Sequence, residues 1–272
     1  MKFTVFGGSG FVGSALSAYL ARQGHEVFIP VRNGEDAIGQ YLGHAVYAIG
    51  MTANFRGRPF ETVDAHVGLL AHLLRNTRFD SWLYLSSTRV YGRVGGGQPV
   101  REDTPIPVTP DADSLYDISK LMGEALCLAQ PSPQVRVARL ANVYGPGQSR
   151  HTFLAAVIAE LSAAGHVEIM ESPVSAKDYV ALSDVIALAE KIALSGRERV
   201  YNVASGARVT HAELAAKLSA LTGGGIRFAG DAPTRIFPEI DIGRIASEFG
   251  HIPAQLLDNL GDLLPASRIN PT

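Results

Sequence analysis

The chain has 272 residues, of which 46% are hydrophobic and 18% charged, a composition typical of a globular protein with a sizeable core. The formal net charge of -2 argues against a nucleic-acid partner, because such binders usually carry a basic excess. The single cysteine, Cys127, excludes a disulfide within the chain. No signal peptide and no membrane-spanning apolar run are visible, so we expect a cytoplasmic protein without a membrane partner.

The first segment predicts a strand, a glycine-rich turn and a helix. An apolar run over 1–6 leads into Gly7, Gly10 and Gly13, and an amphipathic helix is expected over 14–22. Gly7 permits the tight turn, Gly10 lets a pyrophosphate approach the backbone, and Gly13 lets the helix pack close to the sheet. The free N–H groups of the helix N-terminus favour an anion. The context favours a dinucleotide site over an ordinary βα turn.

Two further strands follow this first helix. The strand expected over 26–33 ends beside the adenosine ribose, where an acid favours NAD and an arginine favours NADP. Arg32 stands there with no acid before Glu35, so the sequence favours NADP, unless Arg32 is a solvated loop residue. The connection to the next strand, expected over 44–50, is short for a doubly wound sheet. We therefore expect a shortened sheet edge on that side.

Polar side chains accompany the next helix and strand. His66 lies on or beside the apolar face of a helix expected over 59–75, where a structural histidine is favoured over a catalytic one. Ser86 and Ser87 follow a buried strand over 82–85, and open α/β folds bind ligands at this end of a strand. Local backbone capping is the alternative role for these hydroxyls.

Tyr116 and Lys120 lie four residues apart on a helix expected over 115–128, so they share one face. A nearby ammonium stabilises phenolate, so Lys120 should lower the pKa of Tyr116 from its reference of about 10. Such a tyrosine is an acid/base that works near neutral pH. Alone, the pair also fits a surface Tyr and Lys, but the upstream serines and glycines favour a catalytic pair.

The rest of the chain predicts alternating strands and helices. Strands are expected over 134–140 and 200–204, and helices over 153–164 and 210–221. A segment over 175–185 leads into a helix that ends near 194. Two short amphipathic pieces follow, around 245 and over 256–264. Thr210 and Glu213 form a capping-box pattern at the start of one helix.

Together these motifs resemble the extended short-chain dehydrogenase/reductases, in the sugar-nucleotide epimerase/dehydratase branch. The resemblance covers nearly the whole chain and rests on these segments: 7–13, 86–92, Tyr116 with Lys120, 139–146, 177–180 with Asp184-Val185, and 201–203. It implies an α/β fold, a doubly wound (Rossmann) parallel sheet with a smaller C-terminal α/β substrate-binding lobe. The implied dinucleotide-binding domain comprises 1–145 and about 178–204, and the lobe comprises about 146–177 and 205–272.

The resemblance also implies roles for individual residues. Tyr116 would be the acid/base, Lys120 would hold the nicotinamide ribose, and Ser87 would hydrogen-bond the substrate oxygen. The expected cofactor-binding residues are Gly7, Gly10, Phe11, Val12, Gly13, Arg32, Ala48, Gly50, Tyr116 and Lys120. The expected substrate-binding residues are Thr88, Asn142, His151 and Lys177. His151 stands where similar 3,5-epimerase/4-reductases place a second acid/base, but a helix N-terminal histidine contacting phosphate or solvent is the favoured interpretation.

Three departures from the family pattern matter. The dehydratases of the branch that this chain resembles have Thr-Asp-Glu where this chain has Ser87, Thr88 and Arg89. Water elimination needs a carboxylic acid to protonate the leaving hydroxyl, and these positions hold none. His66 stands where many members have Asn, which puts local cofactor contacts in doubt. Lys177 replaces the usual Arg before Asp-Tyr, and lysine serves only as a point charge.

The expected function is hydride transfer at a carbinol or keto carbon of a nucleotide-activated sugar, with NADP preferred or NAD as cofactor and no metal. A 4-ketoreductase or 4-epimerase is favoured and a 4,6-dehydratase disfavoured. Two alternatives stay open: a reductase of a non-sugar carbonyl, and a non-catalytic NADP-binding regulatory protein. The resemblance further implies polysaccharide biosynthesis and a homodimer formed through the helix that carries Tyr116 and the helix over 59–75.

Overall fold

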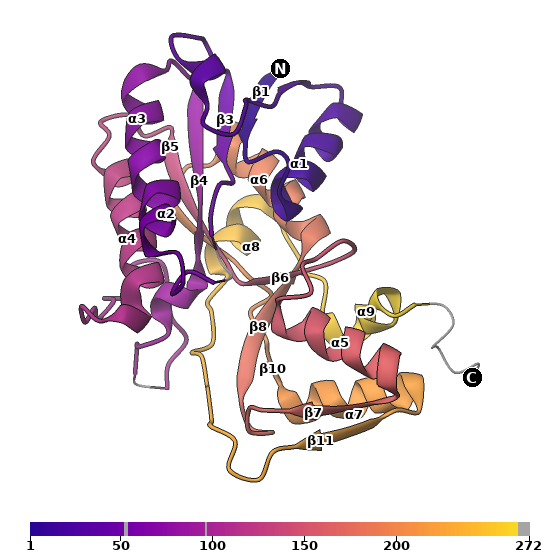
Figure 1. Cartoon of the computed structure of the whole chain (residues 1–272). Coiled ribbons are helices and arrows are strands. Elements are labelled where there is room, and N and C mark those ends of the chain that lie inside the picture. The colour runs from indigo at the N-terminus through magenta and orange to yellow at the C-terminus, as the bar shows by residue number, and fades with distance from the viewer. Residues whose placement is uncertain (52–53, 96, 266–272) are drawn as a thin grey trace.

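The computed structural model describes residues 1–51, 54–95 and 97–265. Its elements form two parts, which Figure 1 shows one above the other. The upper part holds the N-terminus and a large sheet between helices, and the lower part holds α5, α7 and short strands. In the described part of the chain, no helix reaches the length and apolarity that a membrane crossing needs.

A six-stranded sheet forms the centre of the upper part, and all its strands run parallel. In spatial order the strands are β2 (Glu26–Phe28), β1 (Lys2–Phe6), β3 (His44–Tyr47), β4 (Ser81–Ser87), β5 (Val135–Leu140) and β9 (Val200–Val203). The chain order reverses at β1, and doubly wound sheets bind ligands at the carboxyl ends of the strands beside such a reversal. The expected doubly wound α/β fold is confirmed.

Helices cover both faces of this sheet. One face carries α1 (Phe11–Arg22) and α6 (Leu182–Ser195); the other carries α2 (Pro59–Val63), a π-helical turn (Asp64–Gly68), α3 (Leu69–Asn76) and α4 (Leu115–Leu128). Leu16 and Leu20 of α1 belong to the same buried cluster as Leu188 of α6. Leu73 of α3 and Cys127 of α4 bury against the opposite side of the sheet. These two clusters fix the strand ends that carry the candidate site.

The lower part has its own core. Its strands are β6 (Asn142–Tyr144), β7 (His166–Ile169), β8 (Ala176–Ala181), β10 (Arg208–Thr210) and β11 (Gly225–Phe228), and its helices are α5 (Phe153–Ala164), α7 (His211–Thr222) and α9 (Leu256–Asn259). β8 lies between β10 and β6, while β7 pairs with β11. Tyr144, Leu154 and Leu214 are buried together in this core. The capping box predicted for Thr210 and Glu213 is present at the start of α7.

Several elements differ from the sequence-based expectation, among them the second strand and the helix over 59–75. The strand expected over 26–33 ends at Phe28, where its pairing with β1 stops, and Pro30 has no N–H to continue the ladder. β2 is an edge strand among the described residues, which agrees with the expected short edge. The helix expected over 59–75 contains the π-helical turn over Asp64–Gly68.

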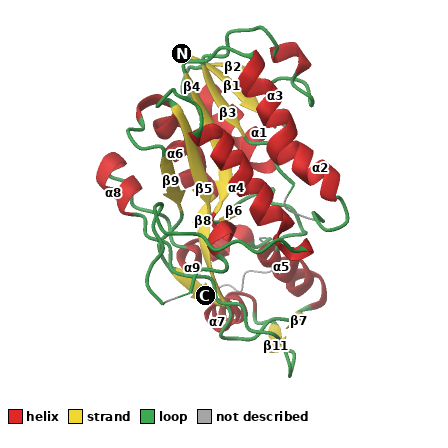
Figure 2. Ribbon diagram, turned by 90° about the vertical axis from the view of Figure 1, so that its left-hand side faces the viewer, coloured by secondary structure: helices red, strands yellow, loops and turns green. Residues whose placement is uncertain are grey.

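The C-terminal region does not stay in the lower part. α8 (Gly243–Phe249) packs against β9, and Figure 2 shows the two side by side. Ile240 and Ile245 are buried in the core of the large sheet, although the expected lobe included all of 205–272. The reason is apolar burial, because Ile245 is fully covered there. Residues of this region, Arg235, Phe237, Pro238 and Ile240, line a cavity that is described below.

Candidate active site

The β1–α1 turn is shaped so that only glycine fits. A Cβ on Gly13 would lie 2.2 Å from the Gly7 carbonyl oxygen, and Gly7 itself has φ +80°. Gly10 is the N-cap of α1, and no side chain caps the helix. The first N–H groups of α1 are thus left for a ligand, and the positive helix end favours an anion. The turn fits the pyrophosphate of a dinucleotide, as its glycines predicted.

A cavity of about 430 Å³ opens between this turn and the neighbouring strand ends. Its wall includes Gly10, Phe11, Val12, Ala48, Gly50, Ser87, Tyr116, Lys120 and Asn142. The structure therefore gathers most of the expected cofactor-binding residues and all three expected catalytic residues in one cavity. A Cβ on Gly50 would lie 3.2 Å from Lys120 Nζ, so a larger residue there would require the amine to shift slightly.

Tyr116 sits in the first turn of α4 and is buried. Burial raises its pKa to about 12, and the Ser87 side chain and the Arg89 guanidinium oppose that rise. The guanidinium carbon of Arg89 lies 5.0 Å from the centroid of the Tyr116 ring. The phenol is therefore protonated in the folded protein and placed between a hydroxyl and a cation.

Lys120 lies one turn after Tyr116 and is also buried. Its Nζ donates to the Leu85 carbonyl oxygen at 2.9 Å, which fixes the amine on the cavity wall. Burial lowers the pKa of Lys120 to about 7, and the nearby Glu124 carboxylate opposes this. The expectation that Lys120 lowers the pKa of Tyr116 is not met in this structure. Burial raises the pKa of Tyr116, and the cation that opposes this rise is Arg89.

His66 is buried next to Gly50, behind the cavity wall. Its Nδ1 lies 2.8 Å from the Ser119 hydroxyl, and the Met51 N–H donates to its Nε2 at 3.1 Å. Burial lowers the pKa of His66 to about 2, so the ring is neutral. The His66 and Tyr116 rings are nearly perpendicular, with their centroids 5.3 Å apart. The favoured interpretation of His66 as a satisfied structural group is confirmed.

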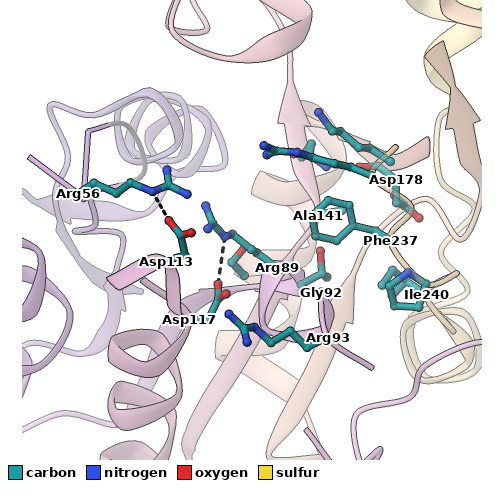
Figure 3. A pocket seen from close by; sticks show the side chains of 16 residues that line it. Arg56, Arg89, Gly92, Arg93, Asp113, Asp117, Ala141, Asp178, Phe237 and Ile240 are labelled. Atoms are coloured by element: carbon teal, nitrogen blue, oxygen red, sulfur yellow. Dashed lines mark hydrogen bonds and ion pairs between the residues drawn. The ribbon is translucent and has the colours of Figure 1, made fainter. Parts of the chain in front are cut away.

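A second cavity, of about 380 Å³, lies beside the first. The two share Ser87, Arg89, Ala141 and Asn142. Figure 3 shows that charged side chains dominate one side of this cavity, while Phe237 and Ile240 form another. Its charged lining residues are Arg56, Arg89, Arg93, Lys177, Arg235, Asp113, Asp117 and Asp178. We refer to it below as the polar cavity.

Three of the four expected substrate-binding residues line these cavities. Thr88 and Lys177 line the polar cavity, and Asn142 lines both. Lys177 Nζ pairs with Glu171 at 3.0 Å, and Asn142 donates to the Asp178 carbonyl oxygen at 2.8 Å. His151 is exposed and lines neither cavity. The structure therefore does not bring His151 to the site.

Arg32 also lies away from both cavities and is exposed in the loop after β2. Asp36 lies in the same loop. Its two carboxylate oxygens accept the Val31 N–H at 3.0 and 3.1 Å. Asp36 thereby fixes the loop that carries Arg32.

A buried ionic network supports the helix that carries Tyr116. The Arg139 side chain on β5 donates to both carboxylate oxygens of Glu124 on α4, with a shortest contact of 2.7 Å. Glu124 also accepts from the Ser86 hydroxyl at 2.5 Å. Removing one partner of such a buried pair is costly, because the other charge is left unpaired. Ser86 is thus engaged in this network, while Ser87 faces the cavity.

Sequence reasoning missed several cavity residues. Arg56, Arg93, Arg235 and Phe237 come from loops and a short turn without a motif, and only the fold brings them to one cavity. The sequence did single out one residue of this group, Arg89, because the dehydratases that the chain resembles have an acid at its position.

Residues 3–204 match the model of the NAD dependent epimerase/dehydratase family. UDP-glucuronic acid decarboxylase 1 of Xenopus tropicalis is 31% identical over 53% of this chain and 42% of its own length. The dTDP-4-dehydro-6-deoxy-D-allose reductase of Streptomyces bikiniensis is 26% identical over 74% of this chain and 60% of its own. The alignments thus span about half the length of these curated relatives.

Solved structures agree over almost the whole chain. RMD from Pseudomonas aeruginosa, complexed with NADPH, is 25% identical with a TM-score of 0.81, and the alignment covers 97% of this chain and 98% of that one. UDP-glucuronic acid 4-epimerase from Bacillus cereus, in complex with UDP-glucuronic acid and NAD, has a TM-score of 0.78 at 19% identity, with 96% of each chain covered. The match of residues 3–204 to the family model agrees with the glycine turn and with the helix that carries Tyr116 and Lys120. The chain therefore belongs to the NAD dependent epimerase/dehydratase family.

Proposed function

We propose that this protein is an NAD(P)-dependent oxidoreductase or epimerase that acts on a nucleotide-activated sugar, as a 4-ketoreductase or a 4-epimerase. The observation that carries the proposal is the common cavity of Ser87, Tyr116 and Lys120 beside the glycine turn. When bound, the cofactor supplies or accepts the hydride. Family membership supports the cofactor class, and the reductase and epimerase among the similar proteins support the reaction class.

The chain's own groups would handle the proton. In the reducing direction, the Tyr116 hydroxyl gives its proton to the oxygen that forms the new carbinol, and Ser87 hydrogen-bonds that same oxygen. The pKa of about 12 keeps Tyr116 protonated near neutral pH, so it is ready to act as an acid. Lys120 has its place fixed by the Leu85 carbonyl and would hold the nicotinamide ribose.

Dehydration is disfavoured by the side chains next to Ser87. Thr88 is neutral and Arg89 is a cation, so neither can protonate a leaving hydroxyl as a carboxylic acid does. The nearest acid on this wall, Asp117, pairs with Arg89 at 3.1 Å. A substrate that enters the site would therefore meet the guanidinium.

The proposed cofactor preference is NADP, on the strength of Arg32. Arg32→Gln should weaken NADPH binding by roughly tenfold and leave NADH binding unchanged, because only NADPH carries the 2′-phosphate. Equal affinities of the unaltered protein for both nucleotides would contradict the preference.

Turnover by Tyr116→Phe tests the whole proposal. We expect a loss of roughly 10²- to 10⁴-fold in the rate of hydride transfer to a 4-keto nucleotide sugar, with nucleotide binding retained. Analysis of nucleotide released on denaturation separates the two reactions, since an epimerase retains its cofactor and a reductase exchanges it. Hydride transfer only to non-sugar carbonyls, or none at all, would overturn the proposal in favour of the two alternatives.

We also propose a homodimer formed through α2 and α4. Phe60 and Val63 on α2 and Met122 on α4 are exposed apolar side chains on helices that contact each other. Light scattering that finds only monomers would contradict this. The expected role in polysaccharide biosynthesis and the expected cytoplasmic location stay predictions.

A further inference from the structure

Arg89 is held rigidly at the border of the two cavities. Its guanidinium carbon lies 4.8 Å from the centroid of the Phe55 ring and 5.0 Å from that of Tyr116. Its Nε pairs with Asp117 at 3.1 Å, and its peptide N–H donates to the Ser87 hydroxyl at 3.2 Å. Stacking on aromatic rings fixes the plane of a guanidinium. Arg89 thus presents a preorganised cation beside the proposed acid/base.

The Nη atoms of the Arg89 guanidinium are available as hydrogen-bond donors. Its Nη atoms form no hydrogen bond with the residues that the structure describes, whereas Nε is engaged by Asp117. The side chain is 35% exposed, so most of it is out of water. A partly desolvated donor pair of this kind is best satisfied by an oxyanion, and the flat guanidinium edge matches a carboxylate with two parallel hydrogen bonds.

Neighbouring charges strengthen the preference for an anion. The guanidinium carbon of Arg56 lies 4.6 Å from the centroid of the same Phe55 ring, and Arg93 lines the same cavity. The cavity lining carries five cations, Arg56, Arg89, Arg93, Lys177 and Arg235, against three acids, Asp113, Asp117 and Asp178. Asp111 pairs with Arg93 and Glu171 with Lys177 and Arg235 from outside the lining.

The existing ion pairs are of a kind that a ligand can replace. Arg56 with Asp113 and Arg93 with Asp111 are solvent-exposed pairs, and such pairs contribute little stability. Lys177 and Arg235 lie near Glu171 in the other part of the molecule. They would serve the diphosphate, which leaves Arg89 and its neighbours for a separate anionic group near the reacting carbon.

We infer that Arg89 determines specificity by binding a carboxylate on the sugar, so that the preferred substrate is an acidic nucleotide sugar rather than a neutral one. This inference rests on the proposed function, because it places the sugar at Ser87 and Tyr116. Arg56 and Arg93 assist by adding positive charge to the same wall. The nucleotide base is not part of the inference.

Pairs of ligands that differ only at the sugar carboxylate test whether Arg89 binds that group. Dissociation constants of the cofactor-loaded protein are measured for UDP-glucuronic acid against UDP-glucose, and for the corresponding acidic and neutral pairs on thymidine and guanosine diphosphates. We expect roughly ten- to hundredfold tighter binding of the acid in at least one pair, from charge-assisted hydrogen bonds. Arg89→Gln should weaken only the acid and bring the ratio near one, and Arg89→Lys should restore part of it.

The control and the opposing outcomes separate this inference from the proposed function. Arg22→Gln removes an exposed cation at the end of α1 and should leave the ratio unchanged. If neutral and acidic sugars bind equally, or if Arg89→Gln weakens both alike, the inference is overturned and the proposed function stands. If no nucleotide sugar of any pair binds, both are overturned.

Discussion

The Arg89 guanidinium carbon lies 5.0 Å from the centroid of the Tyr116 ring, and its charge counteracts the effect of burial on the pKa of that tyrosine. A cation thus lies beside the proposed acid/base, at the position where the dehydratases that the chain resembles have an acidic residue. The contact joins the 3-10 turn over Thr88–Tyr91 to the first turn of α4. It gives Arg89 a second effect, on proton transfer, which a pH profile can measure.

Arg89→Gln should therefore raise the pKa of Tyr116 further above its ordinary value. Oxidation of an alcohol needs the phenolate, and burial raises the pKa of Tyr116, so the oxidation rate should rise with pH across the alkaline range. In Arg89→Gln that rise should shift to higher pH, while reduction, which uses the neutral phenol, keeps its profile. The measurement is kcat in both directions against pH. An unshifted oxidation profile would show that the charge does not act on Tyr116.

Gly13→Ala should lose both stability and dinucleotide binding. The added methyl would lie 2.2 Å from the Gly7 carbonyl oxygen, so the turn has to move. We expect about 1–3 kcal/mol of destabilisation in urea unfolding and no measurable NADPH or NADH affinity. Gly230→Ala is the matched control, because its methyl meets no heavy atom within 4 Å. Normal nucleotide binding by Gly13→Ala would refute the proposed phosphate cradle.

His66→Asn should reduce the acid sensitivity of folding. Burial lowers the pKa of His66 from 6.5 to about 2, so the folded protein keeps the ring neutral. Below about pH 6.5 the unfolded chain takes up a proton that the folded protein does not, so the free energy of unfolding falls as pH falls, by up to about 1.4 kcal/mol per pH unit.

The measurement is urea unfolding at several pH values between about 6 and 4, where this linkage acts. His66→Asn should show a shallower decline than the unaltered protein. His72→Asn, at an exposed site on α3, controls for loss of a histidine as such. Parallel declines in all three proteins would mean that His66 is not the group responsible.

Glu124→Ala should be strongly destabilising, because it leaves the Arg139 guanidinium buried without its carboxylate. We expect about 3–5 kcal/mol in denaturant unfolding. Ser86→Ala removes only one hydrogen bond to the same carboxylate and should cost about 1 kcal/mol. Equal small losses in both variants would show that the ionic contact adds little to the hydrogen bond.

The order of strands and helices was accessible from the sequence where local signals were strong. The glycine turn at Gly7–Gly13, the apolar run before Ser86 and the Tyr116–Lys120 spacing each depend on neighbours in the chain, and each appears as predicted. The short strands β7 and β11 were not predicted, because a four-residue strand gains its stability from a distant partner rather than from its own pattern.

From the sequence alone, local pattern predicted the glycine turn and the shared helix face of Tyr116 and Lys120, and the family resemblance implied the fold class and the role of Ser87. Only the tertiary structure decided the electrostatics. Whether Lys120 or Arg89 acts on Tyr116 depends on burial and on side chains from separate elements. The charged wall of the polar cavity likewise draws Arg56, Arg89 and Arg235 from distant segments. The local sequence pattern does not predict these contacts, because they join side chains that are distant in the chain and close only in the folded protein.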